Sequence, residues 1–433
     1  MLLLLAVLAI GEALGLAAEW RWSFRQRLLD ALALTIRHED PGWPRPEQFW
    51  DPQTHPDTEP LAFRTDDDRK ESITPDKYPP GKLIFVLGES AAEGYGRPFR
   101  ETFAARLDAL LAPQGVRVLD VARSGAGPLQ VMEQARKVLR WYRPTTLIIY
   151  TGNNQWPEIY TQLPVGNSWN PNLVQVLSIL AQSRALAGVE YLAIRWGLRH
   201  RVPPGGTDRY LDGMELRGSR YALAHPLESI VDTDPAAWLH WKRITLERFE
   251  DSLDQIVEHA RERGVRVVLV TMPFAHRLSP AYHIPQLESF DLAHRTEVRG
   301  LLHAAADRVD AGDCPVALET LAKALALDPI PPLPHYLRGE CLERMGRFEE
   351  AEAAYAQSRE NMMGHVGCRL SVNEVIRRVA ARHGTPLVDA AKIFDDYEHA
   401  HGKHFNEDLI FDNCHLSTLG HEVMTDALSP HTF

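Results

Sequence analysis

The chain has 433 residues, of which 45% are hydrophobic and 24% charged, a composition typical of a globular protein with one large domain plus an addition, or with two domains. The formal net charge of −11 and the lack of a long Lys/Arg run argue against a nucleic-acid-binding protein. None of its cysteines forms a Cys-x-x-Cys pair, so a zinc ribbon or a thioredoxin motif is unsupported, and disulfides are permitted but not required. The cysteines are Cys314, Cys341, Cys368 and Cys414.

The amino-terminal residues 1–18 are apolar except for Glu12. This length is near the lower limit for a membrane-spanning helix, and it also suits the core of a signal peptide. No Lys or Arg precedes the run, and the arginines that follow it favour a cytoplasmic body by the positive-inside rule. A start site assigned too late would explain the missing basic residues. We expect residues 1–36 to be a membrane anchor or uncleaved signal rather than a buried amphipathic helix. We favour the exported, periplasmic side for the body and leave the cytoplasmic side open.

Residues 37–80 are rich in Pro and Asp, which predicts an extended linker. Strands and helices then alternate. The predicted strands are Lys82–Leu87, Val116–Val121, Thr146–Thr151, Val265–Thr271 and Pro386–Asp389. The predicted helices are Phe99–Leu111, Leu129–Trp141, Trp238–Arg263, Leu370–His383 and Thr418–Leu428. This alternation predicts an α/β fold with a doubly wound, mostly parallel five-stranded sheet, formed by residues 81–296 and 361–433.

Residues 297–360 interrupt this pattern, because they are helical only and rich in Ala, Leu and Glu. The segment 311–317, A-G-D-x-x-x-A, is echoed 34 residues later by 345–351, M-G-R-x-x-x-A. A period of 34 with small residues at the helix crossings resembles tetratricopeptide repeats. The alternative is two ordinary helical hairpins with coincidental spacing. Because two units are too few for a free-standing solenoid, we expect an insertion packed on the α/β body that could also dock a protein partner.

One turn in the α/β part draws attention. The apolar run Leu83–Leu87 is ended by Gly88, and Ser90 follows just past the break. A serine on the turn between a central strand and a helix projects from the carboxyl edge of the sheet, where open α/β sheets place their sites. The alternative is an ordinary strand-to-helix turn with a capping serine.

Small and polar residues also follow the second and third predicted strands, at 123–127 (R-S-G-A-G) and 150–155 (Y-T-G-N-N-Q), and a further cluster, D-N-C-H, stands at 412–415. Parallel strands bring such turns to one edge of the sheet. Acyl transfer at a serine needs a base, a group that orients the base, and hydrogen-bond donors for the oxyanion. We expect Ser90 to be the nucleophile, His415 the base and Asp412 its orienting group. The expected oxyanion donors are the Asn154 side chain and the backbone N–H groups of Ser90 and Gly125.

These residues form four blocks in chain order: G-E-S at 88–90, Gly125, G-N-N at 152–154 and D-N-C-H at 412–415. Together they resemble the blocks of the SGNH, or GDSL-type, serine hydrolases. The resemblance covers residues 82–151 and 265–428 without the helical insertion. The chain is also similar to a bacterial subgroup of this family that has an amino-terminal anchor and helical repeats. The resemblance implies the same serine, glycine, asparagine and histidine roles, and no cofactor. Two positions differ from the family: Glu89 replaces an aspartate, and Gln155 stands where Asp or Glu is usual.

Other residues are candidates for a substrate-lining role. Glu89 and Asn153 lie within the blocks and Trp156 follows the third one. His276 follows the fourth predicted strand, and its preferred interpretation is an ordinary loop histidine. Cys414 lies between Asp412 and His415 and could itself be nucleophilic, but a packing or disulfide role is preferred. The histidines are scattered and form no His-Glu-x-x-His motif, so we expect no metal site.

These features predict a serine-dependent ester hydrolase or O-acyltransferase, bound to the membrane through its amino terminus, which acts on an acylated glycan, lipid or small ester. The alternative is a non-catalytic, membrane-tethered scaffold that docks a partner through its helical repeats. Intact serine, aspartate and histidine residues favour the enzyme.

Overall fold

The computed structural model of the chain describes residues 61–64, 70–73, 82–154, 235–278, 293–362 and 367–432. The expected anchor at 1–36 lies outside these ranges, as do most of the expected linker and Trp156. Two short strands, β1 (Leu61–Arg64) and β2 (Lys70–Ile73), pair antiparallel within the range expected to be linker. No helix in the described ranges is long and apolar enough to cross a membrane.

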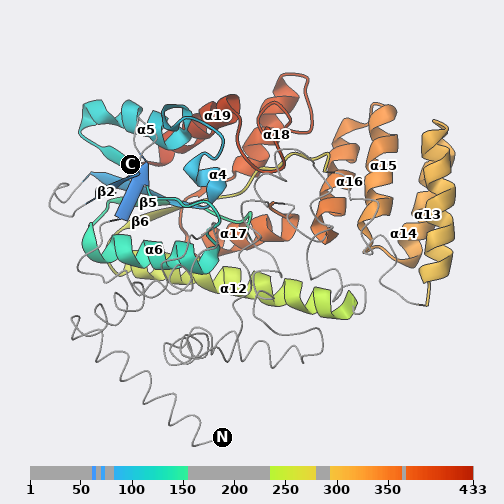
Figure 1. The fold of residues 1–433 in the computed structure, drawn as a ribbon, viewed down its shortest axis with the longest axis horizontal. Coiled ribbons are helices and arrows are strands. Elements are labelled where there is room, and N and C mark those ends of the chain that lie inside the picture. Colours follow the sequence, from blue (N-terminus) through green and yellow to red (C-terminus); the bar gives the residue numbers. More distant parts are fainter. Residues whose placement is uncertain are drawn as a thin grey trace, which may run out of the picture. The chain divides into compact units, whose positions relative to one another are not determined.

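A five-stranded parallel sheet forms the centre of the α/β body (Figure 1). In spatial order its strands are β4 (Arg117–Asp120), β3 (Leu83–Gly88), β5 (Thr146–Tyr150), β6 (Arg266–Val270) and β7 (Leu387–Val388). The central strands β3 and β5 are buried along their whole length, as expected for apolar runs covered on both faces. The predicted α/β fold with a doubly wound, mostly parallel sheet is therefore confirmed.

Helices cover both faces of this sheet (Figure 1). One layer contains α6 (Pro128–Trp141), α12 (Pro235–Arg261) and α17 (Leu370–His383), which pack against one another and against β3 and β6. The other contains α5 (Phe103–Leu111), which packs on β4, and α19 (Thr418–Leu428), with α18 (Ala390–Ala400) beside it. Amphipathic spacing explains these positions; α17, for example, buries Val372, Val375, Ile376 and Val379 against the sheet.

Two helical hairpins form the segment that interrupts the α/β alternation. Its helices are α13 (Arg295–Asp310), α14 (Cys314–Leu327), α15 (Pro332–Arg344) and α16 (Phe348–Asn361). The turn glycines Gly312 and Gly346 have nearly the same positive φ, 75° and 73°. The matching positions Leu321 and Tyr355 are both buried. The period of 34 residues therefore corresponds to two hairpins with the same turn and the same inward-facing positions.

The helical segment is attached to the α/β body by half-buried and exposed polar contacts. Lys242 of α12 lies 2.6 Å from a carboxylate oxygen of Glu360 near the end of α16. Arg277, after β6, binds both Glu343 of α15 and Glu407 of a later loop.

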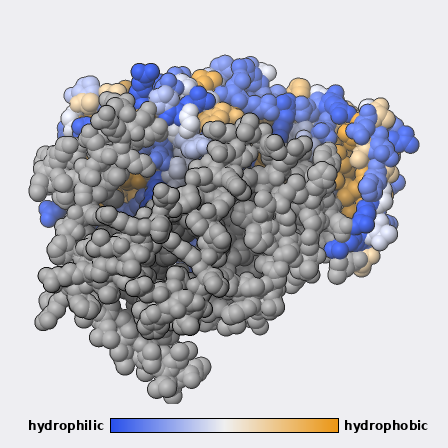
Figure 2. Space-filling model, viewed as in Figure 1, coloured by the Kyte–Doolittle hydropathy of each residue, from blue (hydrophilic) through white to orange (hydrophobic). Residues whose placement is uncertain are grey.

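In Figure 2 the described surface over α18 and α19 is mainly hydrophilic, whereas apolar side chains form a strip over the region of α13–α15.

Candidate active site

The turn after β3 places Ser90 at the carboxyl edge of the sheet. The strand ends at Gly88, and Ser90 begins α4 (Ser90–Glu93), a single helical turn. A Cβ atom at Gly88 would lie 2.0 Å from the carbonyl oxygen of Tyr150 on β5, so only glycine fits where the two strands end. Ser90 is partly exposed, whereas the residues on either side of it are buried. This placement leaves the serine hydroxyl accessible on a rigid base.

Ser90, His415 and Asp412 form one hydrogen-bonded chain. The Nε2 atom of His415 lies 2.8 Å from the Ser90 hydroxyl, and its Nδ1 atom lies 2.6 Å from Oδ2 of Asp412. An ionised carboxylate only accepts hydrogen bonds, so Nδ1 carries a proton and Nε2 of the neutral ring accepts from the serine. These are the distances that nucleophile, base and orienting group require.

The loop before α19 holds His415 and Asp412 in position. The other oxygen of Asp412, Oδ1, accepts the backbone N–H groups of Cys414 and His415, both at 2.8 Å. Ile410 and Leu416 form an antiparallel bridge that closes the loop, and the Ser417 side chain caps α19 by accepting the N–H of Gly420 at 3.0 Å. The carboxylate therefore fixes both the loop and the imidazole.

Burial and charge set the protonation of this pair. Burial would lower the pKa of His415, but the neighbouring Cys414 sulfur and the Asp412 carboxylate outweigh it, and the pKa is raised. Burial raises the pKa of the Cys414 thiol, so this thiol is protonated and neutral at neutral pH. The negative charge that favours the imidazolium form of His415 is therefore that of Asp412. For Asp412 itself, burial acts to raise the pKa, and the hydrogen bond and charge of His415 lower it overall.

Cys414 lies beside the same imidazole as Ser90, at its other ring nitrogen. Its sulfur is 3.8 Å from Nδ1 of His415, which is already bonded to Asp412, and the residue is only 1% exposed. All four cysteines of the chain are buried and free. Because Nε2 contacts Ser90 and not Cys414, the geometry favours the serine as the group that His415 would deprotonate.

Glu89 holds the turn that carries Asn154. It is fully buried, and its carboxylate accepts hydrogen bonds from the Thr151 hydroxyl at 2.6 Å and from the backbone N–H groups of Gly152, Asn153 and Asn154, each at 2.9 Å. Burial raises its pKa to about 7, although these donors act in the opposite direction. The structure thus places Glu89 beneath the turn and not at a surface that could line a substrate.

The remaining expected oxyanion donors lie on turns beside Ser90. One N–H of the Asn154 side chain donates to the carbonyl of Ala126 at 2.7 Å, which ties the two turns together and leaves its second N–H for another acceptor. The turn with Gly125 follows β4 and is fixed to the end of β3 by the Arg123 N–H, which donates to the Gly88 carbonyl at 3.1 Å. Gly125 has a φ of 76°, a conformation that favours glycine, and nothing would contact a Cβ atom there.

The other predicted lining residues are placed differently. Asn153 is 1% exposed, and its side-chain oxygen accepts the N–H of Cys368 at 2.9 Å. His276 is also buried, with Nε2 3.0 Å from Oδ1 of Asp395 on α18. These two residues support neighbouring loops, and Trp156 lies outside the described residues.

Aromatic residues that the sequence did not single out flank His415. The ring of Tyr95 lies 4.8 Å from the imidazole centre, and that of Phe411 lies 5.9 Å away and nearly parallel to it. Phe411 is 42% exposed, and the Arg97 guanidinium lies 4.9 Å from its ring centre. An exposed aromatic ring beside the base is a surface that a substrate could contact. Its only sequence signal is its position next to Asp412.

Arg359 is a second residue that the sequence did not reveal. It comes from α16 of the helical segment and is fully buried, with its guanidinium 4.6 Å from the ring centre of Phe274 and bonded to the carbonyl of Ala275. Burial lowers its pKa to about 10, although the negative charge of Asp412 acts in the opposite direction. The helical segment therefore supplies a buried cation beneath the loop that carries Asp412 and His415.

Comparison with known proteins gives a weak structural likeness. An alpha/beta hydrolase enzyme from the metagenome of Lake Arreo, Spain, has 14% identity and a TM-score of 0.36, over 82% of this chain and 96% of that one. A lipase/acylhydrolase from Enterococcus faecalis has 12% identity and a TM-score of 0.34, over 81% and 95%. A catalytic mutant of an acetylxylan esterase from Geobacillus stearothermophilus has 10% identity and a TM-score of 0.35, over 82% and 96%.

No protein-family model matches the chain, and no curated protein matches it.

Proposed function

We propose that the chain is a serine-dependent ester hydrolase or O-acyltransferase of the SGNH type. The observation that carries this proposal is the hydrogen-bonded series from Ser90 through His415 to Asp412, with distances of 2.8 and 2.6 Å. The turns with Gly125 and Asn154, which lie beside the serine, add the donors that acyl transfer needs. Family resemblance in the same four blocks supports the same conclusion.

In the first half-reaction the Ser90 oxygen attacks the ester carbonyl carbon while its proton passes to Nε2 of His415. The carbonyl oxygen becomes negatively charged and would be stabilised by the backbone N–H groups of Ser90 and Gly125 and by the free side-chain N–H of Asn154. As the carbon–oxygen bond to the alcohol breaks, His415 returns the proton to the departing oxygen. The product is an acyl group on Ser90 and a free alcohol.

In the second half-reaction water, or the hydroxyl of an acceptor, attacks the acyl carbonyl. His415 takes its proton and then gives it to Ser90 as the acyl–enzyme bond breaks. Water yields a free acid, and an acceptor hydroxyl yields a new ester. Asp412 keeps Nδ1 protonated throughout and stabilises the imidazolium that forms in each half-reaction.

The substrate class we propose is an acylated glycan, lipid or small ester. Support comes from the exposed Phe411 ring beside His415 and from the guanidinium of Arg97 over that ring. An aromatic face next to the base suits the apolar part of an ester, and the cation adds a polar edge. Neither residue touches the reacting atoms in this proposal.

Covalent labelling tests the proposal directly. A fluorophosphonate probe should label the wild-type chain once, and peptide mapping should place the adduct on Ser90. The Ser90→Ala variant should show no label, and Cys414→Ser, which keeps the serine and its base, should still be labelled at Ser90. An adduct on another residue, or wild-type turnover of p-nitrophenyl esters by Ser90→Ala, would refute the serine mechanism. Absence of both labelling and turnover in the wild type would favour the scaffold hypothesis.

A further inference from the structure

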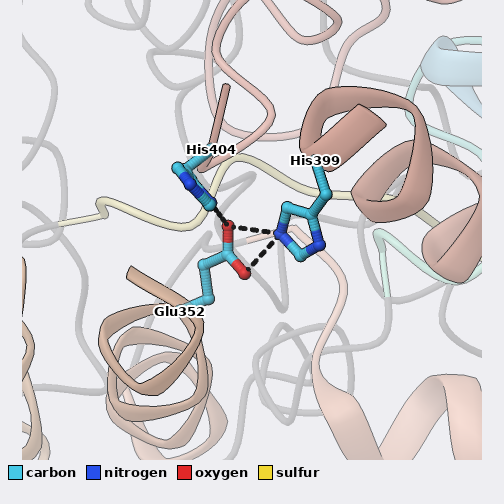
Figure 3. Close-up of side chains that lie close together, drawn as sticks. All are labelled: Glu352, His399 and His404. Carbon is cyan, nitrogen blue, oxygen red and sulfur yellow. Dashed lines mark hydrogen bonds and ion pairs between the residues drawn. The ribbon is translucent and has the colours of Figure 1, made fainter. Parts of the chain in front are cut away.

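A second group of carboxylate and imidazole side chains lies where the helical segment meets the α/β body. Glu352 of α16 faces His399, near the end of α18, and His404, from the loop after α18 (Figure 3). The Nε2 atom of His399 lies 3.0 and 2.9 Å from the two oxygens of Glu352. The Nδ1 atom of His404 lies 3.2 Å from Oε1 of the same carboxylate. One carboxylate is thus shared by two imidazoles.

The carboxylate at the centre of this group is buried. Glu352 is only 7% exposed, and within the described chain its polar partners are the two histidines and the backbone N–H of Phe405, at 3.2 Å. No Lys or Arg side chain in the described ranges is among those partners. A buried carboxylate is costly unless a positive charge and hydrogen bonds compensate it. A protonated imidazole can supply that charge, and so can a bound cation.

We propose that Glu352, His399 and His404 bind a first-row divalent metal ion, with zinc as the best match. Imidazole nitrogen and carboxylate oxygen are ligands that zinc takes in proteins, and three protein ligands leave a fourth position for water. This site is separate from Ser90, His415 and Asp412 and has no part in the proposed acyl transfer.

The positions of the donor atoms fit such an ion. All three ligand atoms lie within 4.8 Å of one another. Bonds of about 2.0–2.1 Å in a tetrahedral zinc site separate ligand atoms by roughly 3.3 Å. The carboxylate–imidazole separations of 2.9–3.2 Å already match this value. The two imidazole nitrogens lie within 4.8 Å of each other, so a shift of the rings toward a common ion would complete the coordination.

Neighbouring groups hold the ligands and attract a cation. The Phe405 N–H fixes one oxygen of Glu352, and the ring of Phe348 stacks on His404 with centroids 4.5 Å apart. Such outer contacts orient metal ligands in known sites. Negative charge from Glu349 and Asp395 also acts on His399. Hydrogen bonding between one carboxylate and one imidazole would need neither the extra negative charge of Glu349 and Asp395 nor the sharing of Glu352 by two histidines.

Metal binding here would tie the helical segment to the loop that leads to the candidate active site. Glu352 belongs to α16, and His404 stands eight residues before Asp412, in the loop that also contains Glu407, a partner of Arg277. A metal bridge would limit the motion of this loop relative to α16. We therefore assign the site a structural role, in which the helical segment stabilises the loop that carries Asp412 and His415.

Zinc binding by the full chain tests the assignment. After removal of metals with a chelator, the wild type should take up one equivalent of zinc in competition with a weaker chelator. Losing an outer partner of a metal ligand typically costs about 10–100-fold in affinity, so losing a ligand should cost about 100-fold or more. Glu352→Gln and His404→Ala should each lose that equivalent. Cobalt in its place should give the visible absorption of tetrahedral coordination in the wild type and not in these variants.

Two controls separate this site from other zinc-binding groups. His401→Ala removes an exposed histidine from the same loop and should keep the equivalent. Asp412, Cys414 and His415 also place their ligand atoms within 4.8 Å of one another, so Cys414→Ser tests that alternative and should likewise keep the tight equivalent. Zinc should also slow amide hydrogen exchange over residues 400–408 in the wild type and in both controls.

The outcome that overturns the proposal is equally clear. If Glu352→Gln and His404→Ala bind zinc as tightly as the wild type, the metal sits elsewhere and the cluster is only a set of hydrogen bonds. Loss of the equivalent in Cys414→Ser alone would assign it to the candidate active site. Because a ligand variant could fail to fold, its circular dichroism spectrum is compared first, and His399→Gln provides a third, milder change.

Discussion

Two of the places in the described chain where a carboxylate meets histidine differ in the third partner. In one, Asp412 binds His415, whose second nitrogen reaches the hydroxyl of Ser90. In the other, Glu352 is shared by His399 and His404, and no hydroxyl is among its partners in the described chain. The first arrangement is a linear series that suits proton transfer between a hydroxyl and an imidazole. The second surrounds a point that a cation can occupy.

Position in the fold explains why the same residue types have different uses. Ser90 and Asp412 stand on loops at the carboxyl edge of a parallel sheet, where side chains converge on one accessible spot. Glu352 and His399 stand on two helices, α16 and α18, and their side chains meet where the helical segment contacts the α/β body. The chemistry therefore depends on the elements that present the carboxylate and the imidazole.

Removal of the hydroxyl or the base should have the largest effect. Ser90→Ala and His415→Ala are each expected to reduce the kcat/KM for short esters by at least about 10⁴-fold, because triad members act as one unit. The double variant should lose little more than either single one. Steady-state kinetics with a p-nitrophenyl ester measures this, and additive losses in the double variant would show that the two residues act independently.

Much of this first region could be predicted from the sequence. Apolar runs ended by Gly88 and Gly152 reveal the sheet edge, and α17 and α19 begin and end at the predicted residues. The reason is that parallel strands and amphipathic helices carry local periodic signals. Ser90, His415 and Asp412 could be proposed because their blocks directly follow predicted strands or precede a predicted helix, although only the geometry shows them in contact.

The second region could not be predicted in this way. Glu352 is separated from His399 by 47 residues, and no motif marks either of them. The helix α18 between β7 and the last loop was also missed, although it supplies His399 and Asp395. Contacts made by helix–helix packing leave no fixed spacing in the sequence. The expectation of no metal site rested only on the absence of a sequence motif. Ligands that come together through tertiary packing need no such motif.

Replacing the orienting carboxylate should have the next largest effect. Asp412→Asn is expected to lower kcat by about 10²–10⁴-fold, because the amide can hold the wrong imidazole tautomer. The wild-type acid limb should lie above the ordinary His pKa of about 6.5, since Asp412 raises the pKa of His415 and only the neutral ring acts as base. In Asp412→Asn this limb should move toward lower pH. A pH profile of kcat/KM that stays in place would mean that Asp412 does not control His415.

Glu89 offers a test of the support beneath the oxyanion donors. In Glu89→Gln an amide NH₂ replaces one acceptor oxygen. Two backbone N–H groups of residues 152–154 would then face this NH₂ without an acceptor. We expect this to lower the free energy of unfolding by about 2–5 kcal/mol at pH 8. Ester turnover should fall too, because this turn carries Asn154. Urea unfolding measures the stability, and Glu89→Asp, which keeps the carboxylate, should lose less.

The same residue predicts a pH dependence of stability. A pKa raised from 4.5 to about 7 means that the folded state holds a proton that the unfolded state releases in this window. Its contribution to stability is therefore full below pH 4.5 and lost as the pH rises to about 7. Glu89→Gln cannot titrate, so this slope should be absent from its unfolding curves. An unchanged slope would show that another group dominates.

The smallest effect is expected at the rim of the site. Phe411 is 42% exposed and stacks near His415, so Phe411→Ala should change the free energy of unfolding by less than about 1 kcal/mol. If its ring contacts the ester, KM should rise by about 3–10-fold with a smaller change in kcat, since one aromatic contact is worth about 0.5–1.5 kcal/mol. Phe411→Leu keeps part of the apolar surface, so its KM should lie between those of the wild type and Phe411→Ala. Leu110→Ala removes another exposed apolar side chain, 51% exposed and on α5, and serves as the control. Equal KM values in Phe411→Ala and Leu110→Ala would restrict the substrate contacts to Ser90 and its hydrogen-bond donors.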